Sequence, residues 1–302
     1  MRILVTGVTG QVGSALATKL AAFGTVVPAD RSVLDLTRPQ DIASRLDEIA
    51  ADVIVNPAAY TAVDRAEDER DLAFLVNAEA PRALAQWSAR RGVPLLHFST
   101  DYVYSGRGST PWKESDETGP LSVYGASKLA GEAAIREVAG PHLIARTSWV
   151  YAPTGSNFLR TIVRLARERE ELRIVADQIG APTSTAIIAD ALAAFCASPG
   201  GLASVIERTD GLVHVAAAGS TSWHGFATSI VDGLRARGIP LKVERITAIG
   251  TADFPTKAQR PINSRLDLSK LSQVLGRSTP DWSVGLTTVL DDLAASGVQR
   301  LI

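Results

Sequence analysis

The chain has 302 residues, of which 46% are hydrophobic and 21% are charged, and its formal net charge is −1. These values are typical of a globular protein with one large domain or two packed lobes, large enough to fold without disulfides. The balanced charge excludes the strong overall attraction to nucleic acid or anionic membranes that basic proteins show. Cys196 is the only cysteine and lies in an apolar stretch, which predicts an unreactive core thiol.

The sequence lacks an apolar run of about 18 residues, the length that a transmembrane helix requires. It opens directly on a strand-like segment, without the pattern of a signal peptide. The four histidines, at positions 97, 142, 214 and 224, do not have metal-ligand spacing. We therefore expect a cytoplasmic protein without a metal centre, a membrane partner or a nucleic-acid partner.

The first half of the chain alternates short β-branched runs with helical periodicity. The pattern predicts strands at 2–6, 26–27, 52–56, 95–99 and 142–145, and helices at about 12–23, 40–50, 70–91 and 124–138. Pro81 predicts a break in the 70–91 stretch, with a second helix capped near Asn77. Strands that alternate with helices predict an α/β fold of the Rossmann type, with a doubly wound parallel sheet.

After about residue 146 the alternation weakens, and turn-rich segments appear at 152–157, 178–183 and 260–265. We expect residues 1–146, plus about 184–217, to form the Rossmann domain. Residues of about 147–183 and 218–302 are expected to form a smaller C-terminal lobe. Ligands of doubly wound sheets bind at the carboxyl ends of the strands. Gly7, Tyr60 and Thr100 lie at or just beyond such ends, which predicts a single site.

A glycine motif with the spacing G-x-x-G-x-x-G, formed by Gly7, Gly10 and Gly13, joins the first strand to the first helix. Glycines permit a tight turn and a close approach to a pyrophosphate, and a helix N-terminus supplies free N–H groups. A plain tight turn is the alternative. The position between a strand and a helix favours a dinucleotide site, and the spacing resembles that of the short-chain dehydrogenases/reductases.

The end of the second strand bears on the choice of cofactor. Asp30 can accept hydrogen bonds from a ribose 2′-hydroxyl, which favours NAD. Arg31 and Ser32 can hold a 2′-phosphate, which favours NADP, although Arg31 can also be a solvated loop charge. We expect NADPH to be preferred and NADH to be accepted. The other expected cofactor contacts follow the second and third strands and are Asp35, Leu36, Ala58, Ala59, Tyr60 and Thr61.

Tyr124 and Lys128 open the helix at 124–138, and their spacing of four places them on one face, one turn apart. A free tyrosine titrates near pH 10, and a nearby ammonium group favours the phenolate and lowers that pKa. Tyr124 would then act as a general acid toward a carbonyl group that is being reduced. Lys128 would also bind the nicotinamide ribose, and the hydroxyl of Thr100 would orient the carbonyl oxygen. A chance surface pair is the alternative.

The chain resembles the dTDP-4-dehydrorhamnose reductases, a branch of the extended short-chain dehydrogenases/reductases. The matching segments are collinear and cover nearly the whole chain, at 9–13, 52–56, 58–67, 99–104, 124–132, 146–151, 177–183 and 260–265. The resemblance implies NAD(P)H-dependent reduction of the 4-keto group of dTDP-6-deoxy-L-lyxo-4-hexulose, the last step of dTDP-L-rhamnose synthesis. It implies Thr100, Tyr124 and Lys128 as the catalytic set and adds Gln11 and Val12 to the cofactor contacts.

The resemblance also implies sugar contacts at Thr100, Asp101 and Trp149, although Trp149 can equally be a core residue. Arg260 is a candidate partner for the pyrophosphate, with a surface ion pair as its alternative. Together with Asn157 and Gln178, these residues complete the expected site for a sugar nucleotide. Some members of the family bridge two subunits with Mg²⁺ through an acid early in the first helix. Ala15 stands there in this chain, so we expect a monomer or a weak homodimer without metal.

Two other functions remain open from the sequence. Another reductase or epimerase of keto-sugar nucleotides would carry the same glycine motif and the same Tyr–Lys pair. Proteins that resemble this branch can also act as non-catalytic regulatory subunits of methionine adenosyltransferase. The presence of Thr100, Tyr124 and Lys128 together favours an enzyme.

Overall fold

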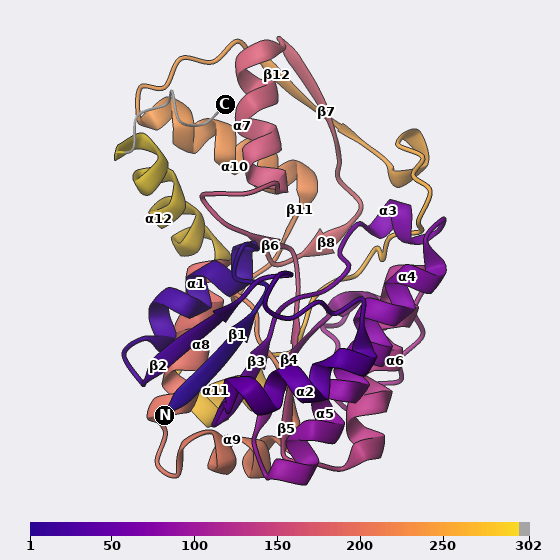
Figure 1. The fold of residues 1–302 in the computed structure, drawn as a ribbon. Helices are drawn as coiled ribbons and strands as arrows, with labels where there is room; N and C mark the ends of the chain where they lie inside the picture. The colour runs from indigo at the N-terminus through magenta and orange to yellow at the C-terminus, as the bar shows by residue number, and fades with distance from the viewer. Residues whose placement is uncertain (296–302) are drawn as a thin grey trace.

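The computed structural model describes residues 1–295, and its centre is a six-stranded parallel sheet (Figure 1). The spatial order of the strands is β10-β5-β4-β3-β1-β2. Their bounds are β1 (Arg2–Thr6), β2 (Thr25–Ala29), β3 (Val53–Asn56), β4 (Leu95–Thr100), β5 (His142–Thr147) and β10 (Leu212–His214). The winding reverses between β1 and β3, because β2 lies on one side of β1 and the later strands lie on the other. Such a switch point is where doubly wound sheets bind ligands.

A layer of helices covers each face of the sheet, which is why the strands read as continuous apolar runs. One face packs against α1 (Gln11–Leu20), α8 (Thr185–Ala197), α9 (Gly201–Thr209) and α11 (Ser269–Leu275). The other face packs against α2 (Pro39–Ile49), α5 (Ala80–Arg91) and α6 (Val123–Val138). The predicted Rossmann-type α/β fold is therefore confirmed.

The C-terminal half contributes a second apolar core beside the first. In Figure 1 this core occupies the upper part of the molecule. It is built by α7 (Phe158–Glu168), β7 (Glu171–Val175), α10 (Trp223–Ala236), β12 (Arg245–Ile249) and α12 (Trp282–Ala295). The packing of α11 differs from expectation: Leu271 and Val274 belong to the core of the sheet, although 218–302 was expected in the second lobe. The division into two lobes otherwise stays a prediction.

Short elements connect the two cores. Two ladders of two residues each pair β6 (Val150–Tyr151) with β9 (Thr183–Ser184), and β8 (Ile179–Gly180) with β11 (Thr221–Ser222). The remaining short helices are α3 (Val63–Ala66), η2 (Asp101–Val103) and η3 (Thr251–Asp253). Within residues 1–295, no single helix is long and apolar enough to cross a membrane. Together α8 and α9 meet those criteria, with a bend of 106° between them.

The helical segment around Pro81 is continuous, although a break was predicted there. The chain passes from α4 (Arg70–Phe74) through a π-helical turn, η1 (Leu75–Glu79), directly into α5. Pro81 lies in the first turn of α5, as predicted, but Asn77 lies inside the π-turn and the predicted cap there is wrong. The reason is close packing: a Cβ on Gly131 of α6 would lie 2.0 Å from the Asn77 carbonyl oxygen. π-Turns often mark functional sites.

A buried ion pair fastens α6 to the sheet. Arg146 of β5 donates to both carboxylate oxygens of Glu132, from Nε at 2.8 Å and from a terminal nitrogen at 2.6 Å. The same guanidinium donates to the hydroxyl of Tyr104 at 2.7 Å. All three side chains are fully buried. Since buried charges are tolerated only when paired and hydrogen-bonded, this cluster makes the position of α6 depend on both partners.

We expect Glu132→Gln to lower the free energy of unfolding by about 3–5 kcal/mol, because it leaves Arg146 as a buried charge without its counter-ion. Urea denaturation measures the loss. The matched control is Glu168→Gln, which breaks the exposed pair of Glu168 with Arg164 at 2.9 Å. We expect that control to cost less than about 0.5 kcal/mol. Equal losses in the two variants would contradict the structural role of the buried pair.

Candidate active site

The glycine motif forms the turn between β1 and α1 as predicted. Gly7 has a φ of +57°, which favours glycine, and its carbonyl accepts a hydrogen bond from the Gly10 N–H at 2.9 Å. A Cβ on Gly13 would lie 2.1 Å from the Gly7 oxygen, so helix and turn can approach only without a side chain there. No side chain caps the N-terminus of α1, and its first turn contains no acidic residue. The turn therefore fits a pyrophosphate.

The segment after β2 closes on itself through Asp30. Its Oδ1 accepts from the backbone N–H and the hydroxyl of Ser32, at 2.8 and 2.6 Å, and these bonds lower the pKa of the carboxyl. Arg31 remains largely exposed and lies 3.4 Å from Asp35. A polar pocket of about 210 Å³ lies here, lined by Arg31, Ser32, Val33, Leu34, Asp35, Arg38, Asp41, Ile42 and Arg45. Leu36 is buried in the core behind it.

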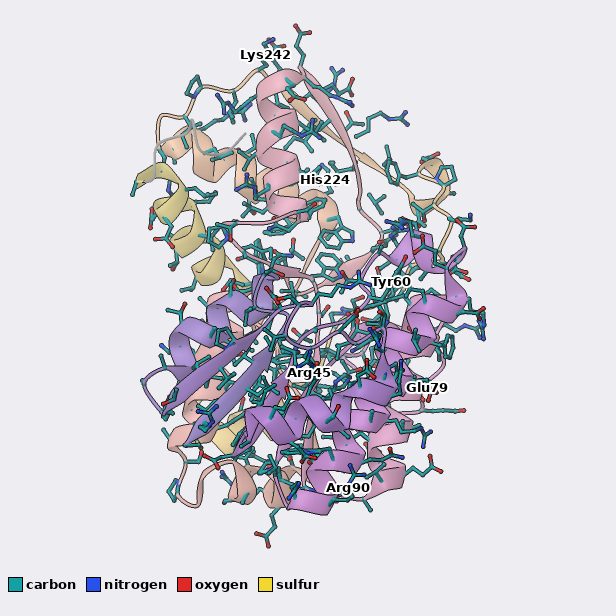
Figure 2. All side chains as sticks on the ribbon, viewed as in Figure 1. Arg45, Tyr60, Glu79, Arg90, His224 and Lys242 are labelled. Atoms are coloured by element: carbon teal, nitrogen blue, oxygen red, sulfur yellow. The ribbon has the colours of Figure 1, made fainter. Side chains whose placement is uncertain are left out.

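This pocket fits a phosphate group better than the sequence analysis recognised. Arg38 and Arg45 also line it and were missed, because Arg31 lies in the turn after β2, Arg38 directly before α2 and Arg45 within α2, so that no single periodicity links the three. Both lie in ion pairs with acids of α2, Asp41 and Glu48. Figure 2 shows Arg45 in the half of the molecule that contains the sheet.

The loop after β3 lies directly against the glycine turn. A Cβ on Gly7 would lie 3.0 Å from Ala58, the first of the small residues 58–61 that were expected to border the cofactor. Asn77 holds this loop, because its amide accepts from the Tyr60 N–H at 2.8 Å and donates to the Tyr60 carbonyl at 3.0 Å. The same amide donates to Ser127 of α6 at 2.9 Å. In Figure 2, Tyr60 lies where the two halves of the molecule meet.

Tyr124 and Lys128 occupy the first turns of α6, which Ser122 caps by accepting from the Gly125 N–H at 3.2 Å. Lys128 is fully buried and donates to the Phe98 carbonyl at 2.6 Å. Burial lowers the pKa of its ammonium group to about 8. Tyr124 is partly exposed at the same edge of the sheet.

The expected lowering of the Tyr124 pKa by Lys128 is not found. Burial raises the pKa of this phenol to about 12; the Thr100 hydroxyl lowers it and Asp101 raises it. The lysine nitrogen is bonded to the Phe98 carbonyl instead. The phenol is therefore protonated at neutral pH, which is the form that can give a proton to a carbonyl oxygen.

Thr100 and Asp101 follow β4 directly and are both buried. The Thr100 hydroxyl donates to Asp101 Oδ1 at 3.2 Å, while Asp101 Oδ2 has no hydrogen-bond partner. Burial raises the pKa of this carboxyl to about 6. An unpartnered buried oxygen is costly, and its presence beside Tyr124 is typical of a site that meets a ligand.

Trp149 lies between β5 and β6, where the chain leaves the sheet for the second lobe. Its φ of +46° is rare for a bulky residue, and such strain is concentrated at functional sites. Its ring stacks on Trp223, with centroids 3.6 Å apart and planes 9° apart. Gly180 permits this stack, since a Cβ there would lie 2.5 Å from the Trp149 ring.

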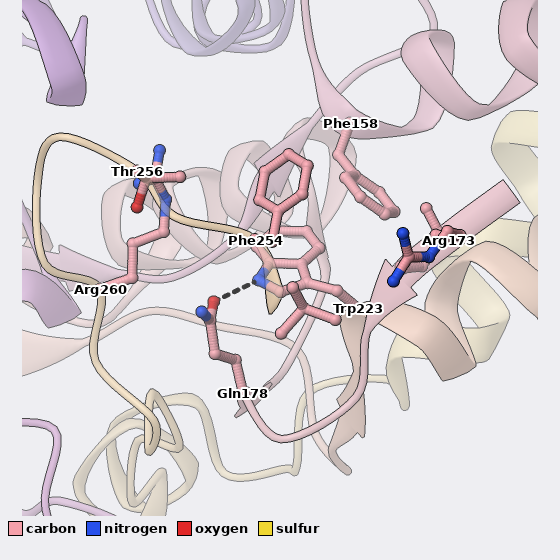
Figure 3. Close-up of a pocket in the computed structure, with 9 residues that line it drawn as sticks. Phe158, Arg173, Gln178, Trp223, Phe254, Thr256 and Arg260 are labelled. Atoms are coloured by element: carbon pink, nitrogen blue, oxygen red, sulfur yellow. Dashed lines mark hydrogen bonds between the residues drawn. The ribbon is translucent and has the colours of Figure 1, made fainter. Parts of the chain in front are cut away.

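A largely apolar pocket of about 220 Å³ opens beside this stack (Figure 3). Gln178 accepts a hydrogen bond from the Trp223 indole at 3.2 Å, as Figure 3 shows, and donates to Thr251 at 3.0 Å. Arg260 lies at the opposite side of the pocket from Arg173. The lining residues are Phe158, Arg173, Ile174, Val175, Gln178, Trp223, Phe254, Thr256 and Arg260.

Arg260 and Asn157 also join the two halves of the chain. Arg260 forms an ion pair with Asp64 of α3 at 2.6 Å, as the alternative to a pyrophosphate contact predicted. Its side chain also borders the pocket. Asn157 caps α7 and donates to Gln11 at 2.8 Å. Its amide is thus occupied by contacts within the protein, and its expected contact with substrate stays a prediction.

Nearly the whole length of the chain is similar to known proteins. The family described as RmlD substrate binding domain matches residues 1–295. A dTDP-4-dehydrorhamnose reductase of Burkholderia thailandensis is 48% identical, over 97% of this chain and 99% of the relative, and that of Escherichia coli K12 is 43% identical, over 97% and 98%. The crystal structure of the Bacillus anthracis reductase in complex with NADP has a TM-score of 0.85 and 34% identity, over 96% of this chain and 99% of that one. This chain belongs to the dTDP-4-dehydrorhamnose reductase family.

Several residues that shape this reductase site were not found from the sequence. Trp223, Phe158 and Phe254 line the pocket: the first two begin helices with ordinary apolar periodicity, and Phe254 lies in a loop, so the sequence does not mark any of them as a site residue. Asn77 gives no local signal, because its role depends on the π-turn. Within residues 1–295, no three His, Cys, Asp or Glu side chains lie together as a metal site. Independence from Mg²⁺ remains a prediction.

We expect Arg31→Ala to raise the KM for NADPH about tenfold, the effect of one charge-assisted hydrogen bond, while the KM for NADH changes little. Steady-state kinetics with each cofactor measures the two values. The control is Arg90→Ala, which removes an exposed arginine at the end of α5 (Figure 2). Equal changes in both KM values would show that Arg31 does not contact the 2′-phosphate.

Proposed function

We propose that this protein reduces the 4-keto group of dTDP-6-deoxy-L-lyxo-4-hexulose to give dTDP-L-rhamnose, with NADPH preferred and NADH accepted. The observation that supports it most is that Tyr124, Lys128 and Thr100 lie at the carboxyl edge of the same parallel sheet as the glycine turn, in a chain that matches this family over nearly its whole length. A related reductase binds NADP, and the arginine-lined pocket after β2 supplies cations for its 2′-phosphate.

The chain's own residues provide the proton and the alignment that the reduction needs. When bound, the cofactor supplies a hydride for C4. Tyr124, which is protonated at neutral pH, donates a proton to the O4 oxygen as charge develops there. The Thr100 hydroxyl, by turning its one proton from Asp101 to that oxygen, donates a second hydrogen bond to O4 and keeps it in line with the phenol. Lys128 holds the ribose side of the cofactor at the same edge of the sheet.

The second lobe supplies the contacts for the rest of the substrate. We assign the sugar to the space between Asp101 and Trp149, where the unpartnered carboxylate oxygen can accept from a sugar hydroxyl. The apolar pocket beside Trp223 is suited to the flat thymine ring, because one of its walls is aromatic. Arg260, at the rim of that pocket, is placed to bind the pyrophosphate.

Product analysis with cofactor stoichiometry tests this function. We expect one NADPH to be oxidised for each 4-keto sugar nucleotide consumed, and dTDP-L-rhamnose to be the product. An epimerase with the same motifs would recycle its nicotinamide and show no net oxidation. Turnover without net oxidation, or the opposite configuration at C4, would refute the assignment. Stoichiometric binding to methionine adenosyltransferase without any turnover would favour the regulatory alternative.

We expect Tyr124→Phe to lower kcat about 10²- to 10⁴-fold, because it removes only the phenolic proton. Cofactor binding, followed by the fluorescence of bound NADPH, should stay near wild type, as should the thermal unfolding midpoint. Tyr102→Phe is the matched control, since Tyr102 packs edge-on against Tyr124 with ring centroids 5.6 Å apart. Wild-type turnover in Tyr124→Phe would rule out this residue as the general acid.

A further inference from the structure

A row of polar side chains crosses three adjacent strands behind Lys128. Thr6 ends β1, Asn56 ends β3, and His97 is paired with Asn56 in the register of β4. At most 1% of each of these residues is exposed, and most of the other buried residues of the three strands are apolar. Buried polar groups are destabilising unless they are hydrogen-bonded, so a row of three demands an explanation.

The row is continuous from the catalytic lysine to the cofactor turn. Lys128 Nζ lies 3.2 Å from His97 Nε2, and the amide nitrogen of Asn56 lies 2.9 Å from His97 Nδ1. The amide oxygen of Asn56 accepts from the Thr6 hydroxyl at 2.6 Å. Thr6 accepts from the N–H of Ala58, which packs against Gly7. Apart from His97, the partner of the lysine nitrogen is the Phe98 carbonyl.

The charge of Lys128 restricts the protons of this row. A neutral imidazole has one N–H and one lone pair, and an ammonium group can only donate. If Nε2 carries the proton, Lys128 must be neutral, and the NH₂ of Asn56 donates to Nδ1, which is the orientation of the amide in the structure. If Lys128 is charged, His97 Nε2 must accept and Nδ1 must carry the proton. The Asn56 amide is then turned by 180°, so that its oxygen faces Nδ1 and its NH₂ faces the Thr6 hydroxyl. A proton on Nε2 therefore excludes a charged Lys128.

We propose that His97 is a positioning residue for Lys128: its neutral imidazole accepts a hydrogen bond from the ammonium group through Nε2, while the Asn56 amide, turned by 180° from its orientation in the structure, accepts from the proton on Nδ1. Together with the Phe98 carbonyl, this bond occupies two of the three donors of the ammonium group, so a single donor is left for the ribose of the cofactor. The inference rests on the proposed function in requiring a charged lysine during reduction.

The surroundings of the pair support a neutral histidine and a charged lysine. Burial and the adjacent Lys128 lower the pKa of His97 well below its usual value. On α6, Glu132 faces the lysine and favours its charged form, but Arg146 of β5 binds both oxygens of that carboxylate. The other titratable groups that face this edge are Tyr124 on α6 and Asp101 after β4, with pKa values of about 12 and about 6.

The expected pH effect follows from these groups. A hydrogen bond to the charged form of an amine raises its pKa, so removing the acceptor lowers the pKa of Lys128 from its value of about 8. Activity that needs the ammonium form is then lost at lower pH. The alkaline limb of the profile of kcat/KM reports this group in the free enzyme. Asp101, with a pKa of about 6, affects only the acid limb.

Two substitutions distinguish the contribution of Nε2 from that of Nδ1. In His97→Gln the amide oxygen lies near the position of Nε2 and can accept from Lys128. In His97→Asn the amide lies near Nδ1 and keeps the contact with Asn56, but the lysine loses its acceptor. We expect His97→Asn to lower kcat about tenfold and to move the alkaline limb down by about one pH unit, which corresponds to the loss of one hydrogen bond to a charged group. We expect His97→Gln to leave the alkaline limb at its wild-type pH and to change kcat by less than about threefold.

The tautomer of His97 gives a readout that does not need turnover. Long-range ¹H–¹⁵N correlation spectra of the wild-type protein resolve its four histidines, and we expect His97 to carry its proton on Nδ1 between pH 6 and about pH 7.5. A proton on Nε2 in that range would overturn the proposal, as would a wild-type alkaline limb and kcat in His97→Asn. If His97→Asn does not fold, the tautomer alone decides. Absence of turnover in the wild type would refute the proposed function and leave the tautomer test intact.

Discussion

The burial of Lys128 constrains everything around the carboxyl edge of the sheet. An ammonium group inside a protein is tolerated only where acceptors replace its water, and here the acceptors are a backbone carbonyl of β4 and a histidine of the same strand. Because the histidine itself needs a partner, β3 must end in an amide, and because the amide needs one, β1 must end in a hydroxyl. A polar residue at the ends of β1 and β3, and one within β4, thus accompany a single lysine on α6.

The same constraint explains the close approach of α6 to its neighbours. Lys128 reaches the sheet only if the helix lies near the backbone of the preceding segments, and two glycines make this possible. A Cβ on Gly125 would lie 2.3 Å from the Tyr102 carbonyl oxygen, and one on Gly131 would lie 2.0 Å from that of Asn77. The π-turn at Asn77 places an amide between α6 and the loop that contains Tyr60. The loop that contains Tyr60 and the helix α6 are therefore held by the same side chain, that of Asn77.

Local patterns were sufficient to predict the sheet, the glycine turn and the Tyr–Lys pair, because each depends on a short periodicity or spacing. The π-turn was missed because it depends on Gly131, which lies more than fifty residues away from Asn77 in the sequence. The pKa of Tyr124 was expected to fall, because proximity of a charge was weighed without the burial that outweighs it. His97 did leave a signal, a polar residue within an apolar strand, whose meaning depends on the position of Lys128 on another element.

We assign recognition of the substrate to the other lobe, where the interactions are of a different kind. The carboxyl edge of the sheet is held by hydrogen bonds and a buried ion pair with fixed directions. The pocket beside Trp223 is formed by stacked rings and by Phe254, which is more than half exposed. Two polar links between the lobes are the ion pair of Asp64 with Arg260 and the hydrogen bond from Asn157 to Gln11. Since Asp64 follows the loop that contains Tyr60 and Arg260 borders the pocket, this ion pair joins the carboxyl edge of the sheet to the pocket through a carboxylate and a guanidinium group.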